Sequence, residues 1–264
     1  WLNRYLQARQ LTEATPFRAV ALTPQMPRML QGRAATLAMN QIGTFAVRGG
    51  AAGGAFEAEY AAAADRLIGG TGREAFDAMR RLERADPSRY APDHGADYPA
   101  TAFGQALRQI AQLVKADLGL EVAFAEIGGW DTHVNQGSTQ GQLATRLDDF
   151  ARSIAALVTD LGDHMADTVV LTMSEFGRAV RENGNRGTDH GHGNAMLVMG
   201  GGVRGGKVYG RWPGLAEEAR YEGRDLAVTT DFRNVFAEIA VRHLGVRDAG
   251  PVFPGFKVEA RNFA

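Results

Sequence analysis

The stretch Leu120-Glu-Val-Ala-Phe-Ala-Glu-Ile-Gly-Gly-Trp-Asp-Thr-His133 joins an apolar run of strand length to a glycine turn and two metal-ligand residue types. Residues 120–127 predict a β-strand, because the run is short and is stopped by Gly128-Gly129. Asp131 and His133 follow this strand directly. In open α/β sheets ligands bind beyond the carboxyl ends of the strands, so we expect both side chains at such a rim.

A long helix and two further strands are predicted after this stretch. Apolar residues then recur at alternating steps of four and three, as on one face of a helix, at Leu143, Leu147, Phe150, Ile154, Leu157 and Leu161. Residues 168–173 and 195–199 are short continuous apolar runs, which predict buried strands. The order strand, helix, strand predicts a βαβ crossover and a mostly parallel sheet, so the fold class is α/β.

The rest of the chain predicts a further strand at 17–22 and helices at 56–67, 73–82, 102–118 and 232–244, with Asp231 as cap or in the first turn of the last. We interpret residues 53–118 as a helical insertion or cap region within a single domain spanning 1–264. The first six residues, Trp1-Leu-Asn-Arg-Tyr-Leu6, resemble the interior of a helix. No initiator Met and no capping residue precede them. We therefore expect a further N-terminal segment upstream of Trp1.

Three short clusters carry the chemistry of the chain. They are Gly-Gly-Trp-Asp131-Thr-His133, Ser-Glu175-Phe-Gly-Arg178 and Gly-Thr-Asp189-His190-Gly-His192-Gly-Asn194, and they hold three of the six histidines. Carboxylate and imidazole groups are the ligands of zinc and manganese. We therefore predict a divalent metal site, with zinc first and manganese or calcium as alternatives, and with the ligands Asp131, His133, Glu175, Asp189, His190 and His192.

Each cluster also has a structural interpretation that the sequence leaves open. Asp131 and His133 are placed where residues cap a following helix, and Asp189 to His192 suit an ordinary surface turn. Glu175 is equally a solvated strand-end acid paired with Arg178. A guanidinium matches phosphate or sulfate oxygens, so Arg178 is a candidate substrate ligand, against the alternative of a salt bridge at a helix start.

Composition excludes several other classes. The 264 residues are 45% apolar and 22% charged, a mix typical of a globular protein with a substantial core. A net charge of −1 without a Lys/Arg cluster argues against nucleic acid as a partner. The chain has no cysteine, which excludes disulfides and thiolate ligands, and no run approaches the length of a membrane span.

The ordered motifs resemble domain-of-unknown-function family 1501, part of the alkaline-phosphatase-like superfamily that includes sulfatases. The resemblance rests on the three clusters, the long helix between the first two, and Thr-Thr230-Asp231-Phe-Arg233. It implies an alkaline-phosphatase-like, mostly parallel sheet with helices on both faces. Phe176 stands where the superfamily has the His of an Asp-His pair, which puts a complete two-metal site in question.

The resemblance also implies an exported bacterial protein, periplasmic or secreted, that hydrolyses phosphate or sulfate esters with a divalent metal. Arg178 and Asn194 would bind the substrate, and the Ser or Thr nucleophile would come from the upstream segment. The alternative is a non-catalytic exported binding protein for anionic glycans or a component of a cell-surface assembly. The oligomeric state is open.

Overall fold

The computed structural model describes residues 1–9, 11, 14–44, 77–83 and 89–264. The predicted helix at 56–67 lies outside these residues, whereas residues 77–83 are helical and confirm the described part of the next one. The chain divides into two compact units: Trp1–Glu126 with Ser153–Leu161, and Ile127–Arg152 with Gly162–Ala264. Each unit is described by itself below, as the first unit and the second unit.

The first unit contains a three-stranded parallel sheet. β1 (Ala19–Ala21) lies between β2 (Leu37–Ala38) and β3 (Val122–Phe124), in the order β2-β1-β3. The central strand is completely buried, as expected where a parallel sheet is covered. All three strands are short, and those within the predicted runs 17–22 and 120–127 begin later and end earlier than predicted. The α/β class is confirmed by this sheet.

Helices of the first unit pack near this sheet. They are α1 (Leu2–Ala8) and α4 (Ala102–Lys115), with short 3-10 helices at Pro16–Arg18, Arg28–Leu30 and Ile42–Thr44. α4 begins at Thr101, whose hydroxyl accepts the N–H of Gly104, and it buries Leu113 in a core shared with Phe17 and Val20. The predicted helix at 102–118 is confirmed, three residues shorter.

A buried carboxylate ties three segments of the first unit together. Asp160, whose side chain is fully buried, lies at the end of α5 (Gln142–Leu161). It accepts hydrogen bonds from the hydroxyls of Tyr90 and Tyr98, from the backbone N–H of Asp93 and from the ammonium of Lys115. Burial and the neighbouring Asp160 raise the pKa of both tyrosines. A buried charge is stable only when paired and hydrogen-bonded in this way.

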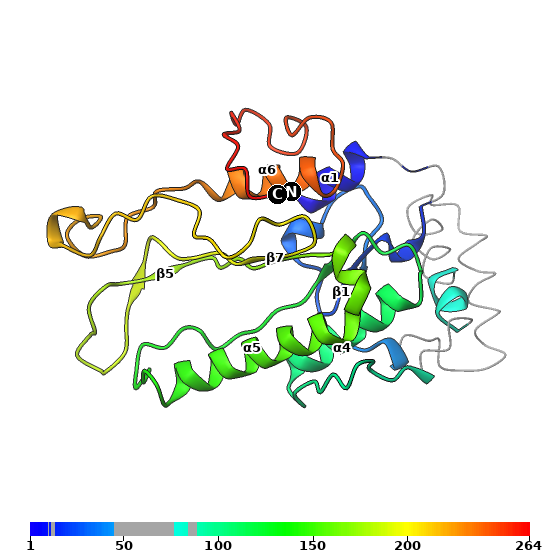
Figure 1. Ribbon diagram of the computed structural model, residues 1–264, viewed down its shortest axis with the longest axis horizontal. Coiled ribbons are helices and arrows are strands. Elements are labelled where there is room, and N and C mark those ends of the chain that lie inside the picture. Colours follow the sequence, from blue (N-terminus) through cyan, green and yellow to red (C-terminus); the bar gives the residue numbers. More distant parts are fainter. Residues whose placement is uncertain (10, 12–13, 45–76, 84–88) are drawn as a thin grey trace, which may run out of the picture. The chain divides into compact units, whose positions relative to one another are not determined.

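The second unit holds antiparallel strand pairs. β4 (Val169–Leu171) pairs with β7 (Val198–Gly200), and β5 (Gly177–Arg178) pairs with β6 (His190–Gly191). The prediction of a mostly parallel sheet is therefore wrong for these strands. β4 and β7 are also half-buried rather than buried. The long helix α5 is confirmed as one unbroken element, whose residues up to Arg152 belong to this unit (Figure 1).

The last helix, α6 (Phe232–Arg242), begins at Asp231, whose carboxylate accepts the N–H of Arg233, as the sequence predicted. The chain after α6 folds back over that helix (Figure 1). Buried Glu238 accepts four backbone N–H groups, from residues 261 and 262 on Oε2 and from residues 263 and 264 on Oε1. Two more 3-10 helices, Gly162–Asp167 and Glu217–Ala219, complete the unit.

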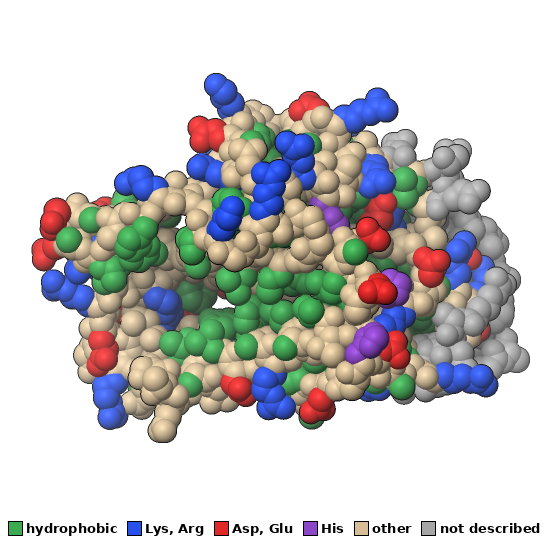
Figure 2. Space-filling model, viewed as in Figure 1, with side chains coloured by type: hydrophobic (Ala, Val, Ile, Leu, Met, Phe, Trp, Pro, Cys, Tyr) green, Lys and Arg blue, Asp and Glu red, His purple; other side chains and the backbone are tan. Residues whose placement is uncertain are grey.

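Acidic and basic side chains are interspersed over the face shown in Figure 2. Among the residues that the structure describes, no helix is both long and apolar enough to cross a membrane.

Candidate metal centre

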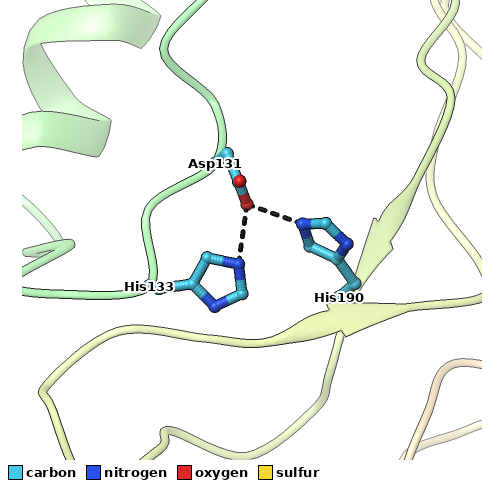
Figure 3. Close-up of side chains that lie close together, drawn as sticks. All are labelled: Asp131, His133 and His190. Atoms are coloured by element: carbon cyan, nitrogen blue, oxygen red, sulfur yellow. Dashed lines mark hydrogen bonds and ion pairs between the residues drawn. The ribbon is translucent and has the colours of Figure 1, made fainter.

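Asp131, His133 and His190 come together in the second unit and form the candidate metal centre. Asp131 and His133 lie in the irregular segment before α5, and His190 is the first residue of β6. One nitrogen from each ring and one carboxylate oxygen lie within 4.8 Å of one another. Figure 3 shows the carboxylate of Asp131 pointing between the two imidazoles. The sequence therefore identified the three residues that meet.

A single oxygen of Asp131 is the hub of this centre. Its Oδ1 lies 2.9 Å from Nε2 of His133 and 2.7 Å from Nε2 of His190. It also accepts a hydrogen bond of 2.8 Å from NH1 of Arg178. The guanidinium of Arg178 and then the ring of His190 hold the pKa of Asp131 below its usual value, so the carboxylate stays ionised.

Main-chain contacts hold the two segments of the centre in register. The N–H of Thr188 donates to the carbonyl of Thr132 at 3.2 Å, and Asn135 and Gln136 donate to the carbonyls of residues 185 and 186. A Cβ on Gly187 would collide with the carbonyl of His133, so only glycine fits there. These main-chain contacts thus set the distance between β6 and the segment that carries Asp131 and His133.

A glycine pair holds β5 against β6 at the same point. Gly177 lies directly opposite Gly191 in the antiparallel register, and Arg178 lies opposite His190. A Cβ on Gly177 would collide with the carbonyl of Gly193, and one on Gly191 would collide with the backbone of Arg178. The two glycines therefore let the backbones approach closely enough to place Arg178 beside His190.

Asp189 reaches the centre through His133. Its Oδ1 lies 2.9 Å from Nδ1 of His133 and accepts a 2.9 Å hydrogen bond from Nδ2 of Asn183. Asn183 also donates to the carbonyl of His133. Asn183 first, and then His133, lower the pKa of Asp189, so this group too is a carboxylate. The ring of His133 is consequently fixed at both nitrogens, between Asp131 and Asp189.

Every nitrogen of the Arg178 guanidinium has a partner within the chain. Nε donates to the hydroxyl of Thr188 at 2.9 Å, NH1 to Asp131, and NH2 to the hydroxyl of Thr132 at 3.4 Å. Gln136 in turn accepts hydrogen bonds from both hydroxyls through its Oε1, at 2.7 and 2.8 Å. Arg178 is therefore held within the candidate metal centre by three hydrogen bonds, in addition to being a predicted anion ligand.

Phe176 packs on both neighbours of the hub. Its ring stacks on the imidazole of His190 with centroids 4.5 Å apart and planes 13° apart. The guanidinium carbon of Arg178 lies 5.5 Å from the same ring. Both are favourable aromatic contacts, so Phe176 helps to orient His190 and Arg178.

The donor set suits a transition-type divalent ion. Zinc bonds nitrogen and oxygen ligands at roughly 2.0–2.1 Å, so two ligands of a tetrahedral ion lie about 3.3 Å apart. Nε2 of the two histidines lies 2.9 and 2.7 Å from Oδ1 of Asp131, about half an ångström closer than this, so both imidazoles would have to move away from the carboxylate to admit the ion. Side chains of Asp131, His133 and His190 are 54%, 40% and 53% exposed, which leaves room for this movement and for a further ligand.

The structure does not bring the remaining predicted ligands into the triad. Glu175 is exposed and lies outside the three groups whose ligand atoms meet. His192 points instead to the buried carboxylate of Asp225, with Nδ1 at 2.7 Å from Oδ2. Asn194 donates to the carbonyl of Phe176 and so supports the backbone beside the centre. These residues surround or adjoin the triad.

Sequence reasoning missed the residues that organise this surrounding shell. Asp225 also pairs with Arg224, whose NH2 donates to the carbonyl of His190 at 3.2 Å. Arg224 and then His192 hold the pKa of Asp225 low despite its burial. Tyr221 lies against the ring of His192, with centroids 4.0 Å apart. Residues 221–226 carry no local pattern that indicates such contacts, because their partners His190 and His192 are about thirty residues away in the sequence.

The family model for the proteins of unknown function DUF1501 matches residues 1–250. No curated protein and no solved structure matches the chain. The matched region covers nearly the whole sequence, including all three clusters. The chain belongs to the DUF1501 family.

Proposed function

We propose that this chain binds one divalent metal ion through Asp131, His133 and His190 and hydrolyses a phosphate or sulfate ester there. The observation that carries the proposal is the convergence of one carboxylate and two imidazole ligand atoms within 4.8 Å. Two nitrogen ligands favour zinc, with manganese next, over calcium, which prefers oxygen. Such an ion polarises an ester oxygen and lowers the pKa of bound water.

The surrounding residues have distinct roles in this proposal. With an ion bound, Nδ1 of His133 would donate to Asp189, 2.9 Å away, and the lone pair of Nε2 would face the ion, as in carboxylate–histidine–metal arrangements. Arg178 supplies the positive charge that would hold the substrate's anion. Glu175 and His192 would contribute only after rearrangement, since neither side chain lies in the triad.

The proposal extends to fold and location. An alkaline-phosphatase-like α/β fold and export to the periplasm or the exterior are what the family resemblance implies, and the small parallel sheet supports the α/β part. Asn194 would stand near the substrate, because it holds the carbonyl of Phe176 beside His190.

A binding protein for anionic glycans is the second candidate, and one observation favours it. The hydroxyls of Thr132 and Thr188, which contact Arg178, both donate to Gln136. We therefore assign neither as a nucleophile. Under this alternative the centre would bind a metal and an anion without turnover.

Metal stoichiometry tests the proposal directly. The full chain, loaded with zinc or manganese and freed of excess ion, should retain one equivalent by elemental analysis. His190→Ala should lose it, and His164→Ala, on a matched exposed histidine in the 3-10 helix after α5, should not. Equal metal content in wild type and His190→Ala would refute the site. A metal-bound protein without turnover on phosphate and sulfate monoesters would favour the binding protein.

A further inference from the structure

We infer that Arg178 couples metal binding to oxyanion binding, so that each ligand strengthens the other. This inference rests on the metal site proposed above. Occupancy of Asp131 by a metal would release NH1 of Arg178, and the released guanidinium nitrogen would then bind a phosphate or sulfate group.

The first step is competition for one oxygen. Oδ1 of Asp131 faces three groups at once: Nε2 of His133, Nε2 of His190 and NH1 of Arg178, at 2.9, 2.7 and 2.8 Å. When a metal binds, each imidazole can turn its lone pair to the ion and remain in place. A guanidinium has no lone pair to offer and carries a positive charge, so its hydrogen bond to Oδ1 is the contact that is lost when this oxygen turns to the ion.

The second step is that Arg178 stays beside the centre after its hydrogen bond to Asp131 is lost. Its Nε remains bonded to Thr188 and its NH2 to Thr132, and Gln136 fixes both hydroxyls. The ring of Phe176 supports the guanidinium at 5.5 Å. The guanidinium is planar and rigid, so it stays in place, and NH1 is left as an unpaired donor next to the metal ligands.

The third step is electrostatic. A metal ion and a guanidinium that share the vicinity of one carboxylate repel each other, which weakens metal binding in the absence of an anion. An oxyanion removes this repulsion and satisfies NH1 with a charge-assisted hydrogen bond. Thermodynamic linkage then requires that the anion tighten metal binding by the same factor as the metal tightens anion binding.

Calorimetric titration of the full chain with Mn²⁺ tests the coupling. The titration is made in chloride, in sulfate and in methylphosphonate at equal ionic strength, so that the two tetrahedral anions are compared with a monovalent reference. We expect one or both tetrahedral anions to lower the Mn²⁺ dissociation constant at least about 5-fold, as is usual for coupled sites. The anion that is effective identifies the ester class.

Arg178→Gln is the informative variant, and Arg181→Gln is its matched control. Arg181 is 73% exposed and pairs only loosely with Glu217, at 3.4 Å. Arg178→Gln should bind Mn²⁺ more tightly than wild type in chloride and should lose the anion effect, whereas Arg181→Gln should keep both properties of wild type. If Arg178→Gln does not fold, judged by circular dichroism, Thr188→Val should weaken the anion effect by removing the Nε anchor.

Each result has a distinct meaning. Mn²⁺ affinity that is equal in all three salts would overturn the coupling and leave the metal site intact. An anion effect that survives in Arg178→Gln would also overturn it. A wild-type chain that binds neither Mn²⁺ nor Zn²⁺ in any of these salts would refute the proposed metal site and the coupling together.

Discussion

Replacing Glu238 by glutamine tests how the C-terminal residues are held on α6. The carboxylate accepts four N–H groups at 2.6–3.0 Å and is 5% exposed. Glutamine keeps one acceptor oxygen, so two N–H groups would face an amide NH₂ instead. A hydrogen bond to a charged group contributes roughly 1.5–3 kcal/mol, so losing two costs at least about 3 kcal/mol.

Hydrogen exchange of the amides at residues 261–264 measures this cost. A loss of about 3 kcal/mol in local opening free energy lowers exchange protection by more than roughly 100-fold. Glu259→Gln is the control, because Glu259 is 70% exposed and its carboxylate lies 3.4 Å from Arg261. Protection in Glu238→Gln that stays within a few-fold of wild type would refute the reasoning.

The same carboxylate predicts a pH dependence. Burial raises the pKa of Glu238, but the backbone N–H groups of residues 261–264 outweigh it and leave the pKa below its usual value. A depressed folded-state pKa stabilises the fold above the unfolded-state pKa, near about 4.3 for glutamate, and the stabilisation is lost as pH falls through the folded value. Protection of residues 261–264 should therefore be constant above about pH 5 and decline in acid.

Three further outcomes are expected. Asp160→Asn should destabilise the chain by about 3–5 kcal/mol in urea titrations, because it breaks a buried ion pair; an equal loss in the exposed-pair variant Asp148→Asn would contradict this. Tyr90 and Tyr98 should remain protonated in spectrophotometric titrations at pH values where the tyrosines of the denatured chain ionise. Ionisation of both rings at those pH values would contradict the raised pKa values. Asp189→Asn should weaken metal affinity about 10- to 100-fold through His133, and unchanged affinity would remove its orienting role.

The helices and the triad were predictable because their signals are local. The apolar spacing over residues 143–161 and 102–118 requires a helix with one buried face, and both helices form. Asp131, His133 and His190 were identified because few other residue types serve a metal. The structure brings one ligand atom of each of these residues together, and their role as metal ligands stays a prediction.

Strand partners and the shell around the triad were not predictable, because they depend on contacts between distant residues. The sequence predicts β4 as a buried parallel strand, but β4 pairs with β7 in the antiparallel direction. No local pattern encodes the register of this pair. His192 was predicted as a metal ligand, but its Nδ1 contacts the carboxylate of Asp225, which is 33 residues away in the sequence. Glu175 was expected directly after a strand, but β4 ends at Leu171 and Glu175 lies exposed in the irregular segment before β5.

The backbone contact at Gly187 has a consequence for ion choice. Because main chain rather than side-chain packing sets how far β6 stands from the Asp131 segment, the opening between the ligands cannot widen freely. Calcium needs oxygen ligands at about 2.3–2.6 Å, and zinc needs about 2.0–2.2 Å. We expect an aperture of this kind to discriminate by ionic radius. A single methyl group at Gly187 would then shift the preference toward larger ions, although residue 187 is not one of the three ligands.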